Sequence, residues 1–329
     1  MNPLFGKKKL ILVDGNHLLH RVLHIPNLQA MATEDGVPTG GVYGFLKTLR
    51  PSIVKLQGAD RIVVAFDGGS SERRKALFPG YRVRPPIEDV IVPGKGQVEK
   101  DSKEAKHGMP YYELFGHQKR YVREWVKAMG CGVIRFDLKE ADDVIYRFTD
   151  LDGGSHLSVI LSDDKDFLQL LSESVHVYRP VADEYYDPDK FKKDWGFPPK
   201  KYLIYKSMFG DDTDKVPGVK GIGDVYATEI TSAVSKPREI VAYCRDHKRK
   251  NVRAVSSEEN IELLKRNLKL FDMRKEEFTK SEIRKMQSTL DAESKVDWGT
   301  LRRIASELKL ESLAGNLGKW MGPFRREGT

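Results

Sequence analysis

The chain has 329 residues, and its 56 Lys and Arg side chains outnumber its 48 Asp and Glu side chains by eight. Hydrophobic residues make up 40% and charged residues 32%, a globular composition that excludes disordered, collagen-like and membrane classes. No apolar run approaches the roughly 18 residues that span a bilayer, and the run 10–13 is too short for a signal peptide. Cys131 and Cys244 are too few for a disulfide framework, so we expect a reducing, cytoplasmic setting and no membrane partner. The basic excess favours a polyanionic partner.

Strand-like and helix-like segments alternate in the first half of the chain. Short, β-branched segments predict strands at 10–13, 62–66, 132–136, 157–161 and 175–178. One-sided apolar spacing predicts helices over 42–53 and 121–129, and Pro51 should end or kink the first of them. This alternation predicts an α/β fold with a mostly parallel sheet and helices on both of its faces.

The second half of the chain has few strand signals. Its apolar spacing predicts helices at 200–209, 225–233, 258–270 and 301–308. We therefore predict an α/β domain over 1–186 and a helical domain over 187–329. The segment 85–110 has four prolines, three glycines and nine charged residues in 26 positions, which predicts a functional or disordered loop.

Acidic side chains follow three of the predicted strands, at the point where each strand ends. They are Asp14 after 10–13, Asp67 after 62–66, and Asp164 with Asp166 after 157–161. The carboxyl ends of parallel strands meet at one edge of a sheet, where ligands bind. The run Glu-Ala-Asp-Asp at 140–143 adds Glu140, Asp142 and Asp143, and the first and last of these share a helix face.

So many carboxylates at one edge repel each other and require a cation. With no cysteine pair or histidine pair nearby, an all-oxygen ligand set selects Mg²⁺ or Mn²⁺. The set is too large for one Mg²⁺, so we expect two ions that clamp the attacking and leaving oxygens of a phosphodiester. As the alternative, Asp14, Asp142 and Asp164 could each be a helix N-cap. Capping does not explain why several strand ends carry acids together.

The segment 210–223 is rich in glycine and lies between two helical patterns. Gly218, Gly221 and Gly223 allow tight turns, and backbone N–H groups at the next helix start can point at a phosphate. Lys220 adds a mobile cation. We interpret the segment as a helix–hairpin–helix that holds a nucleic-acid backbone without reading its sequence, although such a segment can also be a plain turn. Asp211 and Asp214 would connect it to the metals.

A basic strip follows Asp67 without an acid after Arg73. It comprises Arg73, Arg74, Lys75, Arg82 and Arg84. Such a strip is usually a solvated face, but its place beside a metal centre favours contacts with phosphates. Tyr81 could stack on a base, and the segment 85–110 would then be a mobile flap over the site.

Taken together, these motifs resemble the 5′-nuclease (flap endonuclease) superfamily, including phage 5′→3′ exonucleases and the 5′-nuclease domain of bacterial DNA polymerase I. The resemblance spans about residues 10–235 and keeps the family's order. The matching motifs are Leu-Val-Asp-Gly at 12–15, Val-Tyr-Gly-Phe at 42–45, Phe-Asp at 66–67, Tyr-Arg at 81–82, Glu-Ala-Asp-Asp at 140–143, Ser-Asp-Asp-Lys-Asp at 162–166 and the segment 210–223.

The resemblance implies a PIN-like domain, a helical arch at about 82–112, and a helix–three-turn–helix motif that also holds a monovalent cation such as K⁺. It implies a first metal site of Asp14, Asp67, Glu140 and Asp142, and a second of Asp143, Asp164, Asp166 and Asp211 with Asp214 in support. Arg82, where the family has a catalytic Lys, would act with Arg74 and Asp142 in catalysis. Lys215 stands where an Asn is common in the family. Neither change removes a metal ligand.

The implied function is a Mg²⁺-dependent 5′ nuclease, a monomer acting on branched or nicked DNA with 5′ ends or flaps and on RNA–DNA hybrids. It would remove primers or flaps beside replication proteins, as a free-standing nuclease without a polymerase domain. One alternative is a non-catalytic junction-binding protein on the same fold, which the complete acidic set disfavours. Another is an RNA-processing PIN ribonuclease, which would lack the hairpin.

Overall fold

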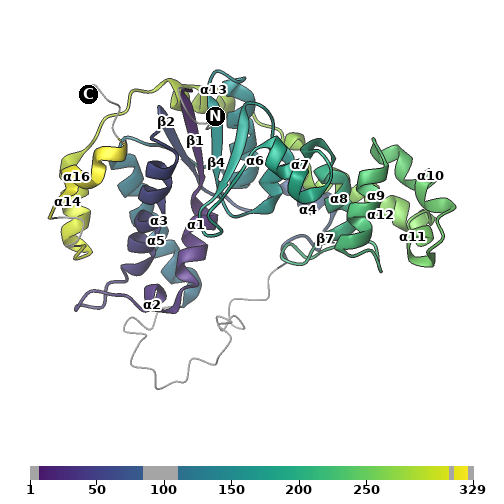
Figure 1. Ribbon diagram of the computed structural model, residues 1–329. Coiled ribbons are helices and arrows are strands. Elements are labelled where there is room, and N and C mark those ends of the chain that lie inside the picture. Colours follow the sequence, from purple (N-terminus) through teal and green to yellow (C-terminus); the bar gives the residue numbers. More distant parts are fainter. Residues whose placement is uncertain (1–6, 84–109, 311–314, 325–329) are drawn as a thin grey trace.

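The computed structural model describes residues 7–83, 110–310 and 315–324, and it confirms the α/β fold (Figure 1). A six-stranded sheet has the order β3-β2-β1-β4-β5-β6, and all neighbours are parallel except β5 and β6. The strands are β1 (Lys9–Asp14), β2 (Arg61–Ala65), β3 (Gly132–Ile134), β4 (Leu157–Leu161), β5 (Val175–Arg179) and β6 (Glu184–Tyr186). The five predicted strands are all present, and β6 is an additional short edge strand.

The sheet separates two apolar cores. Ile11 and Val13 of β1 belong to one core, whereas Leu10 and Leu12 belong to the other. This is the alternation expected of a strand, since successive side chains point to opposite faces. All four are fully buried. Both faces are therefore covered, which explains why the central strands are continuously apolar.

Six α-helices belong to the described residues of the first half of the chain. They are α1 (Gly15–Leu23), α2 (Pro26–Gln29), α3 (Gly40–Lys55), α4 (Glu72–Leu77), α5 (Tyr111–Ala128) and α6 (Ala141–Asp152), with the short 3-10 helix η2 (Lys165–Leu170) after β4. Pro51 does not end α3, which continues through it to Lys55. Proline has no N–H group to donate to the backbone carbonyl four residues earlier. Because Pro51 is exposed, that carbonyl can accept a hydrogen bond from water instead.

The second half is mainly helical and contains one short hairpin. Its helices are α7 (Pro188–Trp195), α8 (Tyr202–Phe209), α9 (Asp224–Ala233), α10 (Ile240–Arg245), α11 (Lys250–Ala254), α12 (Glu258–Phe271), α13 (Lys280–Asp291), α14 (Trp298–Glu307) and α16 (Leu317–Met321). The 3-10 helices are η3 (Pro199–Lys201), η4 (Pro237–Glu239), η5 (Met273–Lys275) and η6 (Gly322–Phe324). Strands β7 (Gly210–Asp211) and β8 (Val216–Pro217) pair between α8 and α9.

The last helices return to the sheet and do not stay with α8–α12. Figure 1 shows α14 and α16 beside α3 and α5, at the opposite end of the molecule from α10 and α11. Leu301, Ile304 and Met321 are buried in the same core as Trp125 of α5. The predicted boundary assigned all of 187–329 to a helical domain, whereas in the structure α13 contacts β2 and β3, α14 contacts α5, and Met321 of α16 is buried in the core of the sheet domain. None of the described helices is both long and apolar enough to cross a bilayer.

Candidate active site

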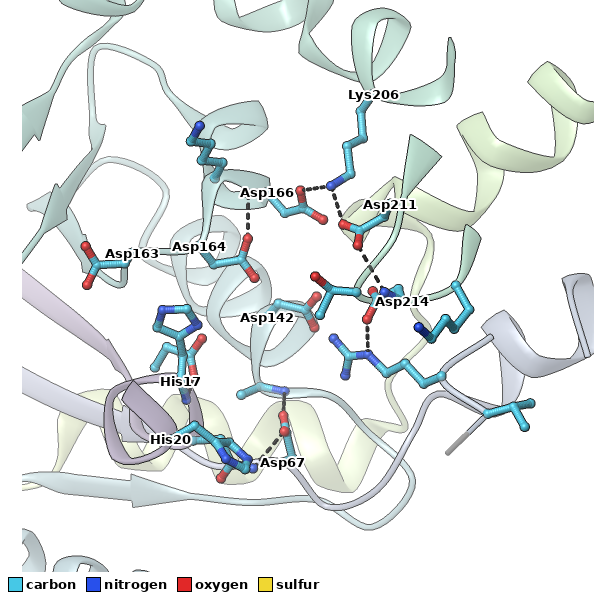
Figure 2. A pocket seen from close by; sticks show the side chains of 18 residues that line it. His17, His20, Asp67, Asp142, Asp163, Asp164, Asp166, Lys206, Asp211 and Asp214 are labelled. Carbon is cyan, nitrogen blue, oxygen red and sulfur yellow. Dashed lines mark hydrogen bonds and ion pairs between the residues drawn. The ribbon is translucent and has the colours of Figure 1, made fainter. Parts of the chain in front are cut away.

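A cavity of about 680 Å³ lies at the carboxyl edge of the sheet, and aspartates dominate its lining. β1 ends at Asp14, Asp67 follows β2, and the segment 163–166 follows β4, so three adjacent parallel strands deliver acids to one place. α6 and the hairpin contribute the others (Figure 2). Eight of the described aspartates line the cavity: Asp14, Asp67, Asp142, Asp163, Asp164, Asp166, Asp211 and Asp214. The structure thus brings together seven of the nine predicted metal ligands.

Asp14 and Asp67 are held in place by neighbouring polar groups. Oδ1 of Asp14 accepts the backbone N–H of His17 at 2.9 Å, so this residue caps α1 and also lines the cavity. Burial, reinforced by the nearby Asp67, raises the pKa of Asp14 to about 7. The carboxylate of Asp67 accepts the side-chain amide of Asn16 at 2.7 Å and the backbone N–H of Ala141 at 2.8 Å. Asp67 therefore ties the ends of β1 and β2 to the start of α6.

Of the three acids that sequence analysis interpreted either as helix caps or as metal ligands, two cap a helix and also line the cavity. Asp14 caps α1, and Asp164 caps η2 by accepting the N–H of Asp166 at 2.8 Å. Asp142 lies inside the first turn of α6 and does not cap it. A cap needs one lone pair of a carboxylate, so the others remain available to the cavity.

Glu140 and Asp143 are the two predicted ligands that the structure does not place in the cavity. Asp143 is fully buried, and its Oδ1 lies 2.8 Å from Nη2 of Arg74. Glu140 accepts the Tyr81 hydroxyl at 2.8 Å and the Ser71 N–H at 2.8 Å. Although burial acts the other way, the surrounding carboxylates raise the pKa of the Arg74 guanidinium above its ordinary value. Arg74 therefore acts as a fixed, permanent counter-cation for this pair.

The basic strip is largely turned inward. Arg74 and Tyr81 are each only 2% exposed, so the expected phosphate contact of Arg74 and base stacking of Tyr81 do not fit their positions. Arg73 bonds Glu276 through Nε at 3.2 Å and the carbonyl of Lys269 through Nη1 at 2.7 Å. Lys75 is exposed on α4. Arg84 and almost all of the predicted arch at 82–112 lie outside the described residues.

Lys206 of α8 connects the two sides of the cavity, and sequence analysis did not identify it. Its Nζ atom lies 2.6 Å from Asp166 and 2.5 Å from Asp211 (Figure 2). Burial lowers the pKa of Lys206, but these carboxylates outweigh it and the net shift is upward. The same ion pair lowers the pKa of Asp211. The only sequence signal was one lysine in an otherwise apolar helix.

Arg82 is fixed to the hairpin from the other side. Its Nε bonds Oδ1 of Asp214 at 2.6 Å, its backbone N–H bonds the Asp214 carbonyl at 3.0 Å, and its Nη1 lies 3.0 Å from Glu140. The backbone at Arg82 is left-handed, with φ 48°, which is rare for a residue other than glycine. The guanidinium that was predicted to meet the scissile phosphate is thus paired with two carboxylates.

The glycine hairpin (210–223) is closely packed at its base and exposed at its tip. A Cβ atom on Gly218 would lie 2.2 Å from the Phe209 carbonyl oxygen, so only glycine fits there. Asn267 of α12 closes the base by donating to the carbonyls of Ser207 and Pro217 at 3.0 and 2.9 Å. Lys220, Gly221 and Gly223 are exposed at the start of α9, where a phosphate could reach them.

The donor set of the cavity fits a hard divalent cation in its chemistry. Its acidic donors are carboxylate oxygens, and mutual repulsion among them adds to burial in raising the pKa of both Asp14 and Asp164. A cation between them would relieve this cost. Within the part of the chain that the structure describes, no three acid, histidine or cysteine side chains already converge as a metal centre. Lys206 and Arg82 neutralise part of the site instead.

Three further residues of the lining were missed by sequence analysis. Asp163 accepts the N–H groups of Val181 and Ala182 at 3.2 Å, which fixes the loop after β5. His17 and His20 line the cavity from α1, and burial lowers the pKa of His17 to about 4, so its imidazole is neutral. His17 and His20 are three positions apart, and sequence analysis did not interpret this spacing as a metal site.

Comparison with known proteins identifies the family. The family model described as 5′-3′ exonuclease, N-terminal resolvase-like domain, matches residues 9–196. The chain is 28% identical over 314 residues to a 5′-3′ exonuclease of Aquifex aeolicus, covering 95% of this chain and 96% of that one. It is 31% identical over 232 residues to the thermostable DNA polymerase I of Thermus aquaticus, covering 70% of this chain but 24% of the polymerase.

The fold agrees with this assignment. A solved complex of the phage T5 D15 flap endonuclease with DNA and metal ions has a TM-score of 0.62 at 19% identity, covering 92% of this chain and 98% of that one. With the acidic cavity at the carboxyl edge of the sheet and the family match over more than half of its length, the chain belongs to the 5′-3′ exonuclease (flap endonuclease) family of nucleases.

Proposed function

We propose that this nuclease hydrolyses phosphodiesters of DNA at 5′ ends and flaps, and of RNA in RNA–DNA hybrids, as primer removal in replication requires. The observation that carries the proposal is the cavity lined by eight aspartates beside a hairpin with an exposed tip. The T5 relative, which was solved with DNA and metal ions, supports the same use of this fold.

Two Mg²⁺ or Mn²⁺ ions are the cofactors that we propose. Asp14, Asp67 and Asp142 would hold one, with Glu140 behind them, and Asp164, Asp166 and Asp211 the other, with Asp143 and Asp214 in support. When bound, such ions supply a nucleophile at neutral pH and neutralise charge on the phosphate. A K⁺ ion at the glycine hairpin is part of the same proposal.

The protein's own groups would orient the ligands and hold the duplex. The amide of Asn16 and the N–H of Ala141 fix both oxygens of Asp67, so this carboxylate keeps one orientation. The exposed N–H groups at the start of α9 would hold backbone phosphates of the duplex without reading its bases. The distance between hairpin and cavity would then set which phosphodiester reaches the aspartates.

The test uses labelled 5′-flap, nicked and RNA-primed substrates, each with Mg²⁺ or with EDTA. Asp164→Asn is the informative variant, because asparagine also caps a helix and therefore preserves the fold of η2. Asp291→Asn, at the exposed end of α13, is the matched control. We expect Mg²⁺-dependent cleavage by the wild type and by the control, and a loss of at least about a hundredfold in Asp164→Asn.

Two results would contradict the proposal in different ways. If the wild type binds these substrates but cuts none of them with Mg²⁺ or Mn²⁺, the chain is a junction binder. If it cuts single-stranded RNA but no 5′-ended DNA structure, it is an RNA-processing enzyme.

A further inference from the structure

We propose that Lys215 is the side chain that contacts a substrate phosphate at the mouth of the aspartate cavity, an inference that rests on the proposed function. Lys215 lies between β7 and β8 of the glycine hairpin, where its side chain is exposed and lines the cavity. It is therefore placed where the hairpin and the acidic site meet.

Two of the other described cations of the cavity are paired with carboxylates. Arg82 pairs with Glu140 and Asp214, and Lys206 pairs with Asp166 and Asp211. Lys165 lies over the ring of Trp195, with Nζ 5.9 Å from the ring centroid. Among the residues that the structure describes, Lys215 makes no ion pair, and its charge remains available to a ligand.

The backbone at Lys215 is unusual for this residue type. Its φ is 60°, in the left-handed region that asparagine and glycine adopt more readily than lysine. The neighbouring chain segment fixes this loop, because the Arg82 N–H bonds the Asp214 carbonyl at 3.0 Å. The hairpin therefore holds Lys215 in an unfavourable backbone conformation at the lining of the cavity.

The electrostatics of the cavity supply a reason for that role. Among the residues that the structure describes, eight aspartates and four lysine or arginine side chains line the cavity, and their formal charges sum to 4 − 8 = −4. A phosphodiester that approaches is repelled, and an unpaired cation at the entrance reduces this repulsion. Lysine suits the position because its compact, mobile charge binds phosphate without a fixed bidentate geometry.

The decisive variant is Lys215→Asn, which removes the charge and relaxes the left-handed backbone. Binding of 5′-flap DNA should be measured in EDTA, over a range of salt concentrations. Losing one phosphate contact should weaken affinity roughly five- to tenfold at about 0.1 M salt and reduce the slope of log K against log salt by about one. Lys215→Arg should keep both the affinity and the slope.

Lys309→Asn is the matched control. Lys309 is also an exposed lysine with a left-handed backbone, at φ 49°, but it lies directly after α14, far from the hairpin (Figure 1). Lys309→Asn removes one positive charge and relaxes a left-handed backbone, as Lys215→Asn does. We expect the DNA affinity of Lys309→Asn to equal that of the wild type. Both Asn variants should unfold at or above the wild-type denaturant midpoint, which separates lost affinity from lost folding.

The inference is overturned if Lys215→Asn binds flap DNA with the wild-type affinity and salt slope. It is also overturned if Lys215→Arg loses as much affinity as Lys215→Asn, because charge would then not be what matters. If the wild type neither binds nor cuts any 5′-ended structure, the proposed function fails together with this inference. If the wild type binds flap DNA and Lys215→Asn binds it equally well, the inference about Lys215 fails but the proposed function stands.

Discussion

The ammonium of Lys206 lies 2.6 Å from Oδ1 of Asp166, inside the aspartate cavity. The same nitrogen bonds Asp211 of the hairpin, so one side chain joins the segment after β4 to the helical half of the molecule. Because Lys206 is 9% exposed, this charge has few water contacts of its own. A cation that the chain itself supplies thus joins the two sides of the cavity.

Replacing Lys206 by methionine should destabilise the metal-free protein by roughly 3–5 kcal/mol, since two largely buried carboxylates lose their partner. Urea unfolding in EDTA measures this loss. Lys190→Met, which breaks a surface pair with Asp194, should cost less than about 1 kcal/mol. Adding Mg²⁺ should restore part of the stability of Lys206→Met. Equal losses of unfolding free energy in the two variants would show that the buried ion pairs of Lys206 stabilise the protein no more than a surface pair does.

The stability of the metal-free protein should depend on pH through Asp14. Its pKa is raised to about 7, so the native state holds this proton more tightly than the unfolded chain. The corresponding stabilisation is fully present below pH about 4 and is lost as the pH rises through about 7. Wild-type unfolding free energy in EDTA should therefore fall more over this range than that of Asp14→Asn, by up to about 4 kcal/mol. If the unfolding free energies of the wild type and Asp14→Asn change with pH in parallel, the pH dependence does not come from Asp14.

Arg74 should be essential for folding stability and should not act as a phosphate-binding residue. Arg74→Met leaves Asp143 buried without its cation and should cost about 3–5 kcal/mol in chemical unfolding. The double variant Arg74→Met with Asp143→Leu should recover most of this loss, because no unpaired charge remains at Asp143. Arg303→Met, which breaks exposed pairs on α14, is the control and should cost under about 1 kcal/mol. A stable Arg74→Met protein with weakened DNA binding would support the original expectation instead.

Two glycines of the hairpin should differ in how much stability is lost when each is replaced by alanine. Gly218→Ala places a Cβ 2.2 Å from the Phe209 carbonyl oxygen and should destabilise the protein by about 1–3 kcal/mol. Gly223→Ala meets nothing within 4 Å, at φ −88°, and should be nearly neutral. Thermal unfolding of both variants decides between them. Equal melting temperatures would show that the hairpin base can shift without cost.

Much of the sheet and of the acidic edge was predictable because local patterns determine both. Runs such as Leu10–Val13 are apolar and bounded by charge, and an acid directly after such a run has to lie at the sheet edge. β6, β7 and β8 are only two or three residues long and carry no measurable period. They were missed for that reason.

The roles of individual charges were less predictable. Arg74 meets Asp143 across 69 positions of the chain, and no spacing rule indicates such a pair. Asp142 and Asp143 are adjacent in sequence, yet one lines the cavity and the other is buried with Arg74, because successive residues of α6 face different directions. The apolar side chains of α14 follow a helical period in the sequence, so the helix could be predicted. This period does not indicate which part of the protein the apolar face packs against.

The return of α14 and α16 to the sheet domain constrains how the chain acquires its structure during synthesis. Leu301, Ile304 and Met321 complete a core whose first members are near residue 11, so that core stays unfinished until almost the whole chain has been synthesised. Until then, Trp125 and its neighbours on α5 lack part of the apolar surface that covers them in the folded protein. Along the chain, the helices between β6 and α13 separate two parts of this core, and truncating the chain before residue 301 should damage the sheet domain first.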